Sequence, residues 1–372
     1  MKMIYRQAPA ITFIISVYNT GSRLKACVRS VLEQSLSAIE IVLVDDGSTD
    51  ATLSLAQSIA KDEPRVRVFT QANLGASSAR NAGLRKAMQE DSKVILFGED
   101  VAQLGGVFRV TEGIHAEFGD SRIFNSPIAE SGIVGTAIGL AMRGYRPVAE
   151  IQFDGFIFPA FDQITTQLAK MQNRSEGFTP MPVVIRVPYG GGIGAVEHHS
   201  ESPEAYFAHT AGLRVITPSN PNDAYWMIQQ AIKSNDPVMF FEPKRRYWQK
   251  GPVNLDEPPM GAHQARVLLE GSHVTIATYG PMTAVALQAA EIAASEGTSI
   301  EVIDLRSLSP IDFDTVINSV KKTGRLIVAS EASTFVSISS EIAARVAEKA
   351  FYHLEAPVLR VGGFDVPYPA AK

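Results

Sequence analysis

Runs of apolar residues alternate with amphipathic segments along most of the chain. In the first hundred residues, the apolar runs predict strands and the segments between them predict helices, in strict alternation. The strands expected from this pattern are 11–17, 39–44, 66–70 and 94–97, and the helices are 23–34, 49–61 and 77–89. Strands that are apolar on both faces are typical of a parallel sheet covered by helices on both sides.

The same alternation returns in the second half of the chain. A polar, proline-rich stretch from 243 to 263 contains no clear element and indicates a linker. Strands are expected at 183–187, 215–217, 238–241, 274–278, 300–304 and 326–330, and helices at 223–233, 283–296, 312–322 and 339–351. The fold class predicted for the whole chain is therefore α/β, with open and mainly parallel sheets.

Composition narrows the class of protein without identifying it. A length of 372 residues predicts about two or three domains. The net charge of −5 argues against a general binder of nucleic acid or of membrane surfaces. The apolar run at 11–17 is far shorter than the roughly 20 residues that cross a bilayer. The single cysteine, Cys27, excludes an internal disulfide framework and fits a reducing compartment, so a cytoplasmic location is expected.

Two acidic residues, Asp45 and Asp46, stand where the second strand gives way to a helix. Open α/β sheets bind ligands at that end of a strand, although a simple turn with a helix cap has the same pattern. The motifs "SVYN" (16–19), "DDGS" (45–48) and "NLGASSARNAG" (73–83) follow in this order. Together they resemble the opening half of family 2 glycosyltransferases over about residues 10–85. The resemblance implies a Rossmann-like βαβαβ segment, half of a GT-A fold, with Asp45 and Asp46 as a remnant nucleotide site.

The metal site of such a transferase is not expected in this chain. The family places an acidic pair on the next strand to bind Mg²⁺ or Mn²⁺, which neutralises the leaving diphosphate. Here the strand runs into "GEDV" (98–101), in which the acids come late and stand side by side. The acceptor half, with its catalytic base, is also missing. The segment therefore predicts an incomplete transferase site, and no metal ligands are assigned.

From about residue 79 the chain resembles a different family, the β subunits of thiamine-diphosphate-dependent 2-oxoacid dehydrogenases. The motifs that carry this resemblance include "VILFGEDV" (94–101), "PIAESGIVGTAIGLAMRGYRPVAEIQFDGFIFPAFDQI" (127–164), "VPYGGGIGAVEHHSESPEAYFAH" (187–209) and "EVIDLRSLSPID" (301–312). It implies a transketolase-like pyrimidine-binding domain and a transketolase C-terminal-like domain. The expected division is 1–85, 86–250 and 251–372, with the last domain shorter at its end than in the family.

The resemblance also implies roles for residues around the coenzyme. Glu130 matches the glutamate that hydrogen-bonds the pyrimidine ring nitrogen of thiamine diphosphate, which drives the ring to its imino form. A helix N-terminal acid stabilised by the helix dipole is the alternative interpretation of Glu130. Ile128 and Gln152 are expected to line the aminopyrimidine pocket, and Phe156 to stack on the ring.

A histidine pair is the second candidate for chemistry. His198 and His199 are adjacent, so they cannot share one metal in the usual i, i+4 arrangement. The family has a histidine directly before its "SxSPEA" segment, which selects His199. Its implied role is proton transfer to the dithiolane of a lipoyl arm during acyl transfer, which suits a group that titrates near neutrality.

One missing motif predicts the partners. The family binds Mg²⁺ and the coenzyme diphosphate through a "GDG…N" motif of its α subunit, and this chain has no such motif. The resemblance therefore implies an α₂β₂ heterotetramer with β–β contact, docked on a lipoyl acyltransferase core, with no nucleic-acid or membrane partner. Segment 194–209 favours a branched-chain 2-oxoacid over pyruvate. Two alternatives to a dehydrogenase β subunit stay open, namely a nucleotide-sugar-binding glycosyltransferase module and an inactive gene fusion.

Overall fold

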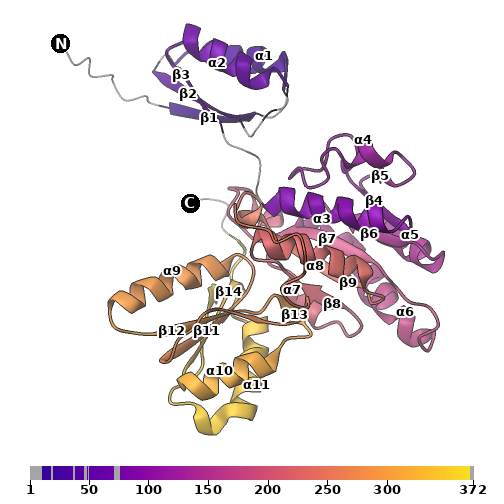
Figure 1. The fold of residues 1–372 in the computed structure, drawn as a ribbon, viewed down its shortest axis with the longest axis vertical. Coiled ribbons are helices and arrows are strands. Elements are labelled where there is room, and N and C mark those ends of the chain that lie inside the picture. Colours follow the sequence, from indigo (N-terminus) through magenta and orange to yellow (C-terminus); the bar gives the residue numbers. More distant parts are fainter. Residues whose placement is uncertain are drawn as a thin grey trace. The chain divides into compact units, whose positions relative to one another are not determined.

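The computed structural model describes residues 11–17, 20–36, 38–45, 48, 50–70 and 76–368 (Figure 1). The chain forms two compact units, Met1–Leu74 and Gly75–Lys372. Helix α3 (Ala76–Glu90) therefore belongs to the second unit, although its sequence lies in the motif shared by both resemblances. The division at 85 and 250 stays a proposal about domains.

The first unit is a parallel three-stranded sheet with two helices. Its strands pair in the order β1-β2-β3, with a helix in each connection. The elements are β1 (Ile11–Val17), α1 (Arg23–Leu32), β2 (Ile39–Asp45), α2 (Thr52–Asp62) and β3 (Val66–Thr70). Leu24 and Val28, one turn apart on α1, pack with Ile41 and Leu43 of β2 to form its core. The predicted βαβαβ arrangement is confirmed for these residues.

A seven-stranded sheet forms the first half of the second unit. Its order is β13-β8-β9-β7-β6-β4-β5, and every pair is parallel except β13 with β8. The strands are β4 (Val94–Gly98), β5 (Ile123–Asn125), β6 (Arg146–Glu150), β7 (Val184–Tyr189), β8 (Arg214–Ile216), β9 (Val238–Pro243) and β13 (Ser307–Ser309). The main helices are α3, α4 (Ile114–Phe118), α5 (Glu130–Met142), α6 (Ala169–Arg174), α7 (Glu204–Ala208) and α8 (Pro221–Lys233).

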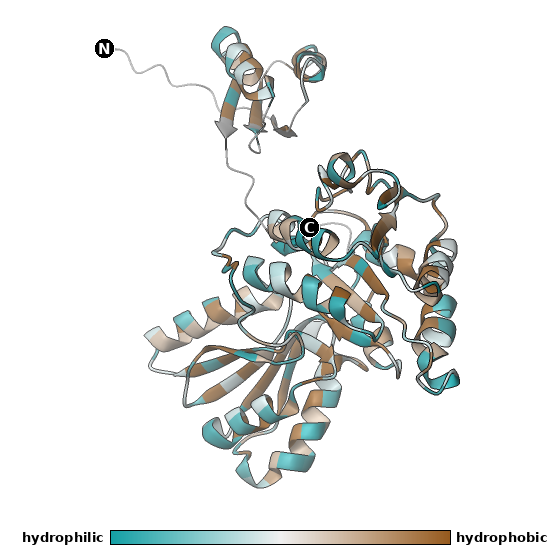
Figure 2. Ribbon diagram, turned by 45° about the vertical axis from the view of Figure 1, so that its right-hand side comes forward, coloured by the Kyte–Doolittle hydropathy of each residue, from teal (hydrophilic) through white to brown (hydrophobic). Residues whose placement is uncertain are grey.

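A five-stranded sheet forms the other half, in the order β10-β12-β11-β14-β15. Its elements are β10 (Arg266–Leu269), β11 (Val274–Thr278), α9 (Met282–Ser295), β12 (Ile300–Asp304), α10 (Phe313–Thr323), β14 (Leu326–Ser333), α11 (Ile338–Ala350) and β15 (Leu359–Gly363). Successive residues of a strand face opposite sides of the sheet. On β11, Ile276 packs with Ala286 of α9, and the next residue, Ala277, lies in the core shared with α10 and α11. Apolar strands lie between helices whose outer faces are polar (Figure 2).

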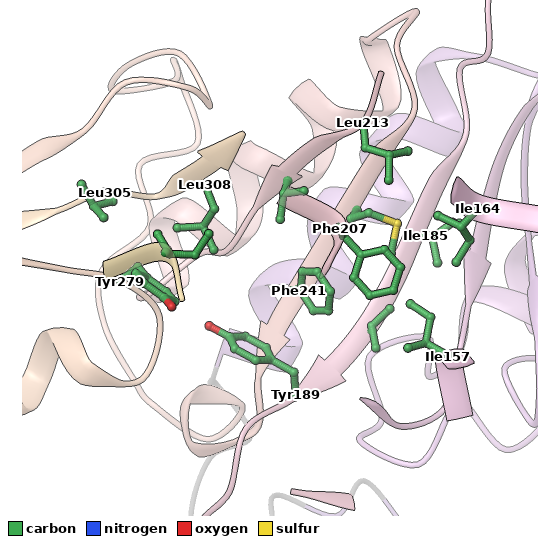
Figure 3. Packing of buried hydrophobic residues seen from close by; sticks show 14 of the residues in the cluster. Ile157, Ile164, Ile185, Tyr189, Phe207, Leu213, Phe241, Tyr279, Leu305 and Leu308 are labelled. Carbon is green, nitrogen blue, oxygen red and sulfur yellow. The ribbon is translucent and has the colours of Figure 1, made fainter. Parts of the chain in front are cut away.

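The two sheets of the second unit share one hydrophobic core. The cluster runs from Ile157 and Phe207 of the first half, through Leu308 of β13, to Leu305 of the second half (Figure 3). At its centre the hydroxyl groups of Tyr189 and Tyr279 turn toward each other, and the Tyr279 hydroxyl donates to Glu204 at 2.7 Å. Strand β13 crosses from the second half to pair with β8. These contacts explain why the two halves form one unit.

The described helices include none with the length and the apolar character that a bilayer crossing requires.

Candidate active site

The amino end of helix α5 holds the first candidate residue. Glu130 begins the helix, and Ile133 and Val134 anchor the helix in the core. The Glu130 side chain is 8% exposed, and none of the described residues donates a hydrogen bond to it or forms an ion pair with it. Ile128, two residues earlier, is 83% exposed. A carboxylate without a partner beside an exposed apolar side chain suits an aromatic ring that offers a nitrogen to the carboxylate.

Glu99 is a second carboxyl group near Glu130. The sequence motifs assign it no role. It follows β4, is buried, and has an Oε1 atom without a hydrogen-bond partner. Burial, together with the neighbouring charges of Glu130, Asp100 and Glu150, raises the pKa of Glu99 to about 7. A carboxyl group with this pKa can give or take a proton near neutral pH.

Gly98 explains how Glu99 reaches this position. Its φ is +154°, and a Cβ there would lie 2.5 Å from the carbonyl oxygen of Glu150 on the adjacent strand β6. Only glycine allows the two backbones to approach so closely. The signal available from the sequence was the position of Glu99 at the carboxyl end of a strand, where α/β sheets place their ligands.

Gln152 and Phe156 connect the acidic residues to the histidine pair. The Gln152 amide donates a long hydrogen bond, 3.5 Å, to Asp100. Phe156 lies in the 3₁₀ helix η1 (Asp154–Ala160), and its ring meets that of His199 edge-on with centroids 5.1 Å apart. The structure therefore gathers Glu130, Gln152, Phe156 and His199 around one region of the first half of the second unit.

His199 lies over an aromatic floor. Its ring centroid is 4.2 Å from that of Phe153, and its Nδ1 atom is buried without a hydrogen-bond partner. Burial lowers the pKa of His199, and the charges of His198 and Lys244 lower it further, while Glu197 opposes them. His198 is half exposed and lies 3.7 Å from Glu197. Of the two imidazoles, that of His199 is therefore the one held in a defined environment.

A buried ion pair supports this floor. The Lys244 ammonium donates to Asp154 at 2.7 Å, and both side chains are fully buried. Burial raises the pKa of Asp154 to about 6, although the charge of Lys244 opposes that shift. Asp154 is the first residue of η1, so the pair fixes the start of the segment that carries Phe156.

The candidate residues of the first unit lie apart from this site in the sequence. Asp45 ends β2, and its buried side chain accepts a hydrogen bond from the backbone N–H of Ser48 at 3.2 Å. This bond is typical of the turn in the simpler interpretation of the sequence, whereas the N-cap of α2 is Ala51 and makes no side-chain cap hydrogen bond. Asp46 lies outside the described residues. Within the described ranges, no three His, Cys, Asp or Glu side chains are placed to hold a metal ion.

Comparison with protein families gives three matches along the chain. The transketolase pyrimidine binding domain matches residues 72–249, and the transketolase C-terminal domain matches residues 263–372. Glycosyl transferase family 2 matches residues 12–100. The first and third matches overlap on helix α3 and strand β4.

Individual relatives agree with these matches. The chain is 64% identical over 317 residues to a pyruvate dehydrogenase E1 component subunit beta of Leifsonia xyli subsp. xyli, which covers 85% of this chain and 93% of the relative. It is 53% identical over 297 residues to a 3-methyl-2-oxobutanoate dehydrogenase subunit beta of Mycobacterium tuberculosis, covering 79% and 85%. Among solved structures, a split gene transketolase described as an inactive beta4 tetramer matches with a TM-score of 0.65 and 26% identity, covering 80% of this chain and 91% of that chain.

Proposed function

Because this chain belongs to the β subunits of thiamine-diphosphate-dependent 2-oxoacid dehydrogenases, we propose that it supplies the aminopyrimidine half of the coenzyme site in the oxidative decarboxylation of a 2-oxoacid. The observation that supports this proposal best is the unpaired carboxylate of Glu130 at the start of α5, beside the exposed Ile128. A site of this kind fits the pyrimidine ring, because the ring has both an apolar face and a nitrogen that can share a proton.

When bound, thiamine diphosphate supplies the nucleophilic carbon and the electron sink that decarboxylation requires. Glu130 would hold the pyrimidine nitrogen by sharing a proton with it. Glu99, whose pKa burial raises to about 7, would exchange protons with that region at neutral pH. Ile128, Gln152 and Phe156 would form the pocket wall, and the α subunit would hold Mg²⁺ and the diphosphate.

His199 would serve the second half of the reaction, transfer of the acyl group to a lipoyl arm. Its role would be to give a proton to a sulfur of the dithiolane ring. Burial lowers the pKa of His199, so its protonated form is a stronger acid than an ordinary imidazolium. The aromatic floor formed by Phe153 and Phe156 would keep the ring in one orientation.

The assembly that we propose is α₂β₂ with β–β contact, docked on a lipoyl acyltransferase core in the cytoplasm. Large apolar side chains on the surface of the second unit support a protein partner, among them Phe335, Tyr352 and Phe364. Segment 194–209 leads us to favour a branched-chain substrate, such as 3-methyl-2-oxobutanoate, over pyruvate. One relative is named for pyruvate and the other for 3-methyl-2-oxobutanoate. Competition between these two 2-oxoacids in one assay is therefore the decisive comparison.

The test is co-expression with an α subunit, followed by two assays on the purified complex. Dye reduction measures decarboxylation alone, and lipoamide acylation measures the full reaction. Glu130→Gln should lower both activities by at least 100-fold, because the amide cannot take up the shared proton. His199→Ala should lower only acylation by a similar factor, with His198→Ala as the matched control. Undiminished dye reduction by Glu130→Gln would contradict the assignment.

A second candidate function rests on the match of residues 12–100 to glycosyl transferase family 2. Two residues of the last glycosyltransferase-like motif, Arg80 and Asn81, lie within the second unit. Asn81 donates to the carbonyl oxygens of Val110 and Glu112 at 2.8 and 2.9 Å, and Arg80 is fully buried inside the second unit. Neither side chain is available to a sugar nucleotide, so we rank this function second. A micromolar dissociation constant for a UDP-sugar would reverse the ranking, and a stable but inactive α₂β₂ complex would favour an inactive fusion.

A further inference from the structure

A buried cluster of four charged side chains lies between helix α3 and the seven-stranded sheet. Its members are Arg80 of α3, Glu150 of β6, Arg186 of β7 and Glu242 of β9, and none is more than 5% exposed. Arg186 donates to both carboxylate oxygens of Glu242, at 2.8 and 2.9 Å, and also to Glu150. Two positive and two negative charges make the cluster neutral as a whole.

Arg80 differs from the other three in how it is held. Its Nε atom lies 3.6 Å from Glu242, and its guanidinium is 4.7 Å from the centre of the Tyr247 ring. None of its three guanidinium nitrogens has a hydrogen-bond partner among the described residues. An arginine that is buried without hydrogen bonds loses its hydration, and only its charge can offset that loss. The arrangement therefore indicates a role for the charge of Arg80.

We infer that Arg80 is a positioning residue whose charge balances Glu150 and Glu242, and that it thereby couples helix α3 to the carboxylates of the active site. Glu150 is the link, because it is bonded to Arg186 and also pairs with Gly98, the residue before Glu99, where β4 and β6 lie side by side. Its charge is one of those that raise the pKa of Glu99. The connection to catalysis rests on the proposed function, whereas the charge balance is a property of the chain alone.

Removing the charge of Arg80 would change the protonation of the carboxylates in this cluster. Arg186 would then face two carboxylates, and one of them would bind a proton. Glu242 keeps two bonds from Arg186 and a third from the Tyr247 hydroxyl at 2.7 Å, so Glu150 would be the group that binds the proton. Burial and the charge of Glu242 already raise the pKa of Glu150, against the charges of Arg186 and Arg80.

The test measures the unfolding of the full-length chain between pH 5.5 and 8.5. Arg80→Met keeps the volume of the side chain without its charge, and Arg80→Lys keeps the charge. Arg80→Met should lose stability relative to the parent chain as pH rises, by up to tenfold in the unfolding constant per pH unit, because its folded form retains one more proton. Arg80→Lys should show a much smaller pH-dependent loss.

The double variant Arg80→Met with Glu150→Gln leaves one cation and one anion, and its stability relative to the parent should no longer depend on pH in this way. A loss in Arg80→Met that is equal at every pH would show a packing role and overturn the inference. If Arg80→Met does not fold, folding of the double variant supports the inference and its failure overturns it. These measurements need no activity, so they stay informative if the proposed function fails.

In the assembled enzyme, the same single variant should move the pH profile of dye-linked decarboxylation, because loss of the Glu150 charge lowers the pKa of the neighbouring Glu99. An unchanged profile beside a pH-dependent stability loss would confine the role of Arg80 to charge balance and overturn the coupling to the active site.

Discussion

At the scale of single residues, Val336 has a backbone conformation that its residue type disfavours. Val336 lies between β14 and α11 with a φ of +47°, and its side chain is 74% exposed. A β-branched residue rarely adopts the left-handed region, because its Cβ crowds the backbone. Glycine has no Cβ and adopts this region without that cost, so the positive φ makes Val336 a position that glycine would suit better.

Val336→Gly should therefore stabilise the chain by about 1 kcal/mol, which is the relief of backbone strain less the greater chain entropy of glycine. The midpoint of denaturant unfolding measures this gain. Val336→Ala is the matched control, since it removes the exposed apolar side chain but keeps the Cβ. Equal gains from alanine and glycine would mean that the apolar side chain, and not the backbone, was the cause.

At the scale of elements, the position of the histidine pair depends on a close approach between two 3₁₀ segments. A Cβ at Gly155 in η1 would lie 2.4 Å from the carbonyl oxygen of His198 in η3 (Glu197–His199). The glycine therefore lets the histidine segment rest directly on η1, where His199 meets Phe153 and Phe156.

Gly155→Ala should lift the histidine segment away from this floor. With less burial and greater distance from Lys244, the pKa of His199 should rise toward its ordinary value, which NMR titration of the imidazole measures directly. Acyl transfer to lipoamide should fall at least tenfold. Gly139→Ala on α5 is the control, because nothing lies within 4 Å of a Cβ there. An unchanged His199 titration in Gly155→Ala would show that the approach does not hold the ring.

Most elements could be predicted from the sequence, because buried parallel strands such as β4 and β9 are continuous apolar runs. Strand β6 escaped prediction because Arg146, Pro147 and Glu150 interrupt its pattern, and β15 because its residues are largely exposed. The neighbourhood of Glu99 could not be predicted, since it follows from β4 pairing with β6, which are far apart in the chain. The burial of Arg80 likewise depends on the packing of α3, which helical periodicity alone does not specify.

At the scale of the whole second unit, buried carboxyl groups link stability to pH. Burial raises the pKa of Glu99, Glu204 and Asp304 to about 7, from ordinary values near 4. In each case the folded protein binds a proton that the unfolded chain releases at lower pH. The resulting stabilisation is complete below the ordinary pKa and is lost as pH rises through about 7. We expect the chain to unfold at higher denaturant concentration at pH 5.5 than at pH 8.

Glu204 allows this link to be tested at the junction of the two sheets, where it accepts a hydrogen bond from the Tyr279 hydroxyl. Burial opposes its charge, and the charges of Glu331 and Asp154 add to that effect, while Tyr279 lowers the pKa. Glu204→Gln keeps the acceptor for Tyr279 and cannot ionise. It should match the parent chain in stability near pH 5 and exceed it at pH 8 by up to about 3 kcal/mol, the equivalent of the pKa difference. Glu291→Gln, on the exposed face of α9, should follow the parent at both pH values. A Glu204→Gln variant whose stability falls between pH 5 and 8 as steeply as that of the parent would show that Glu204 is not the titrating group.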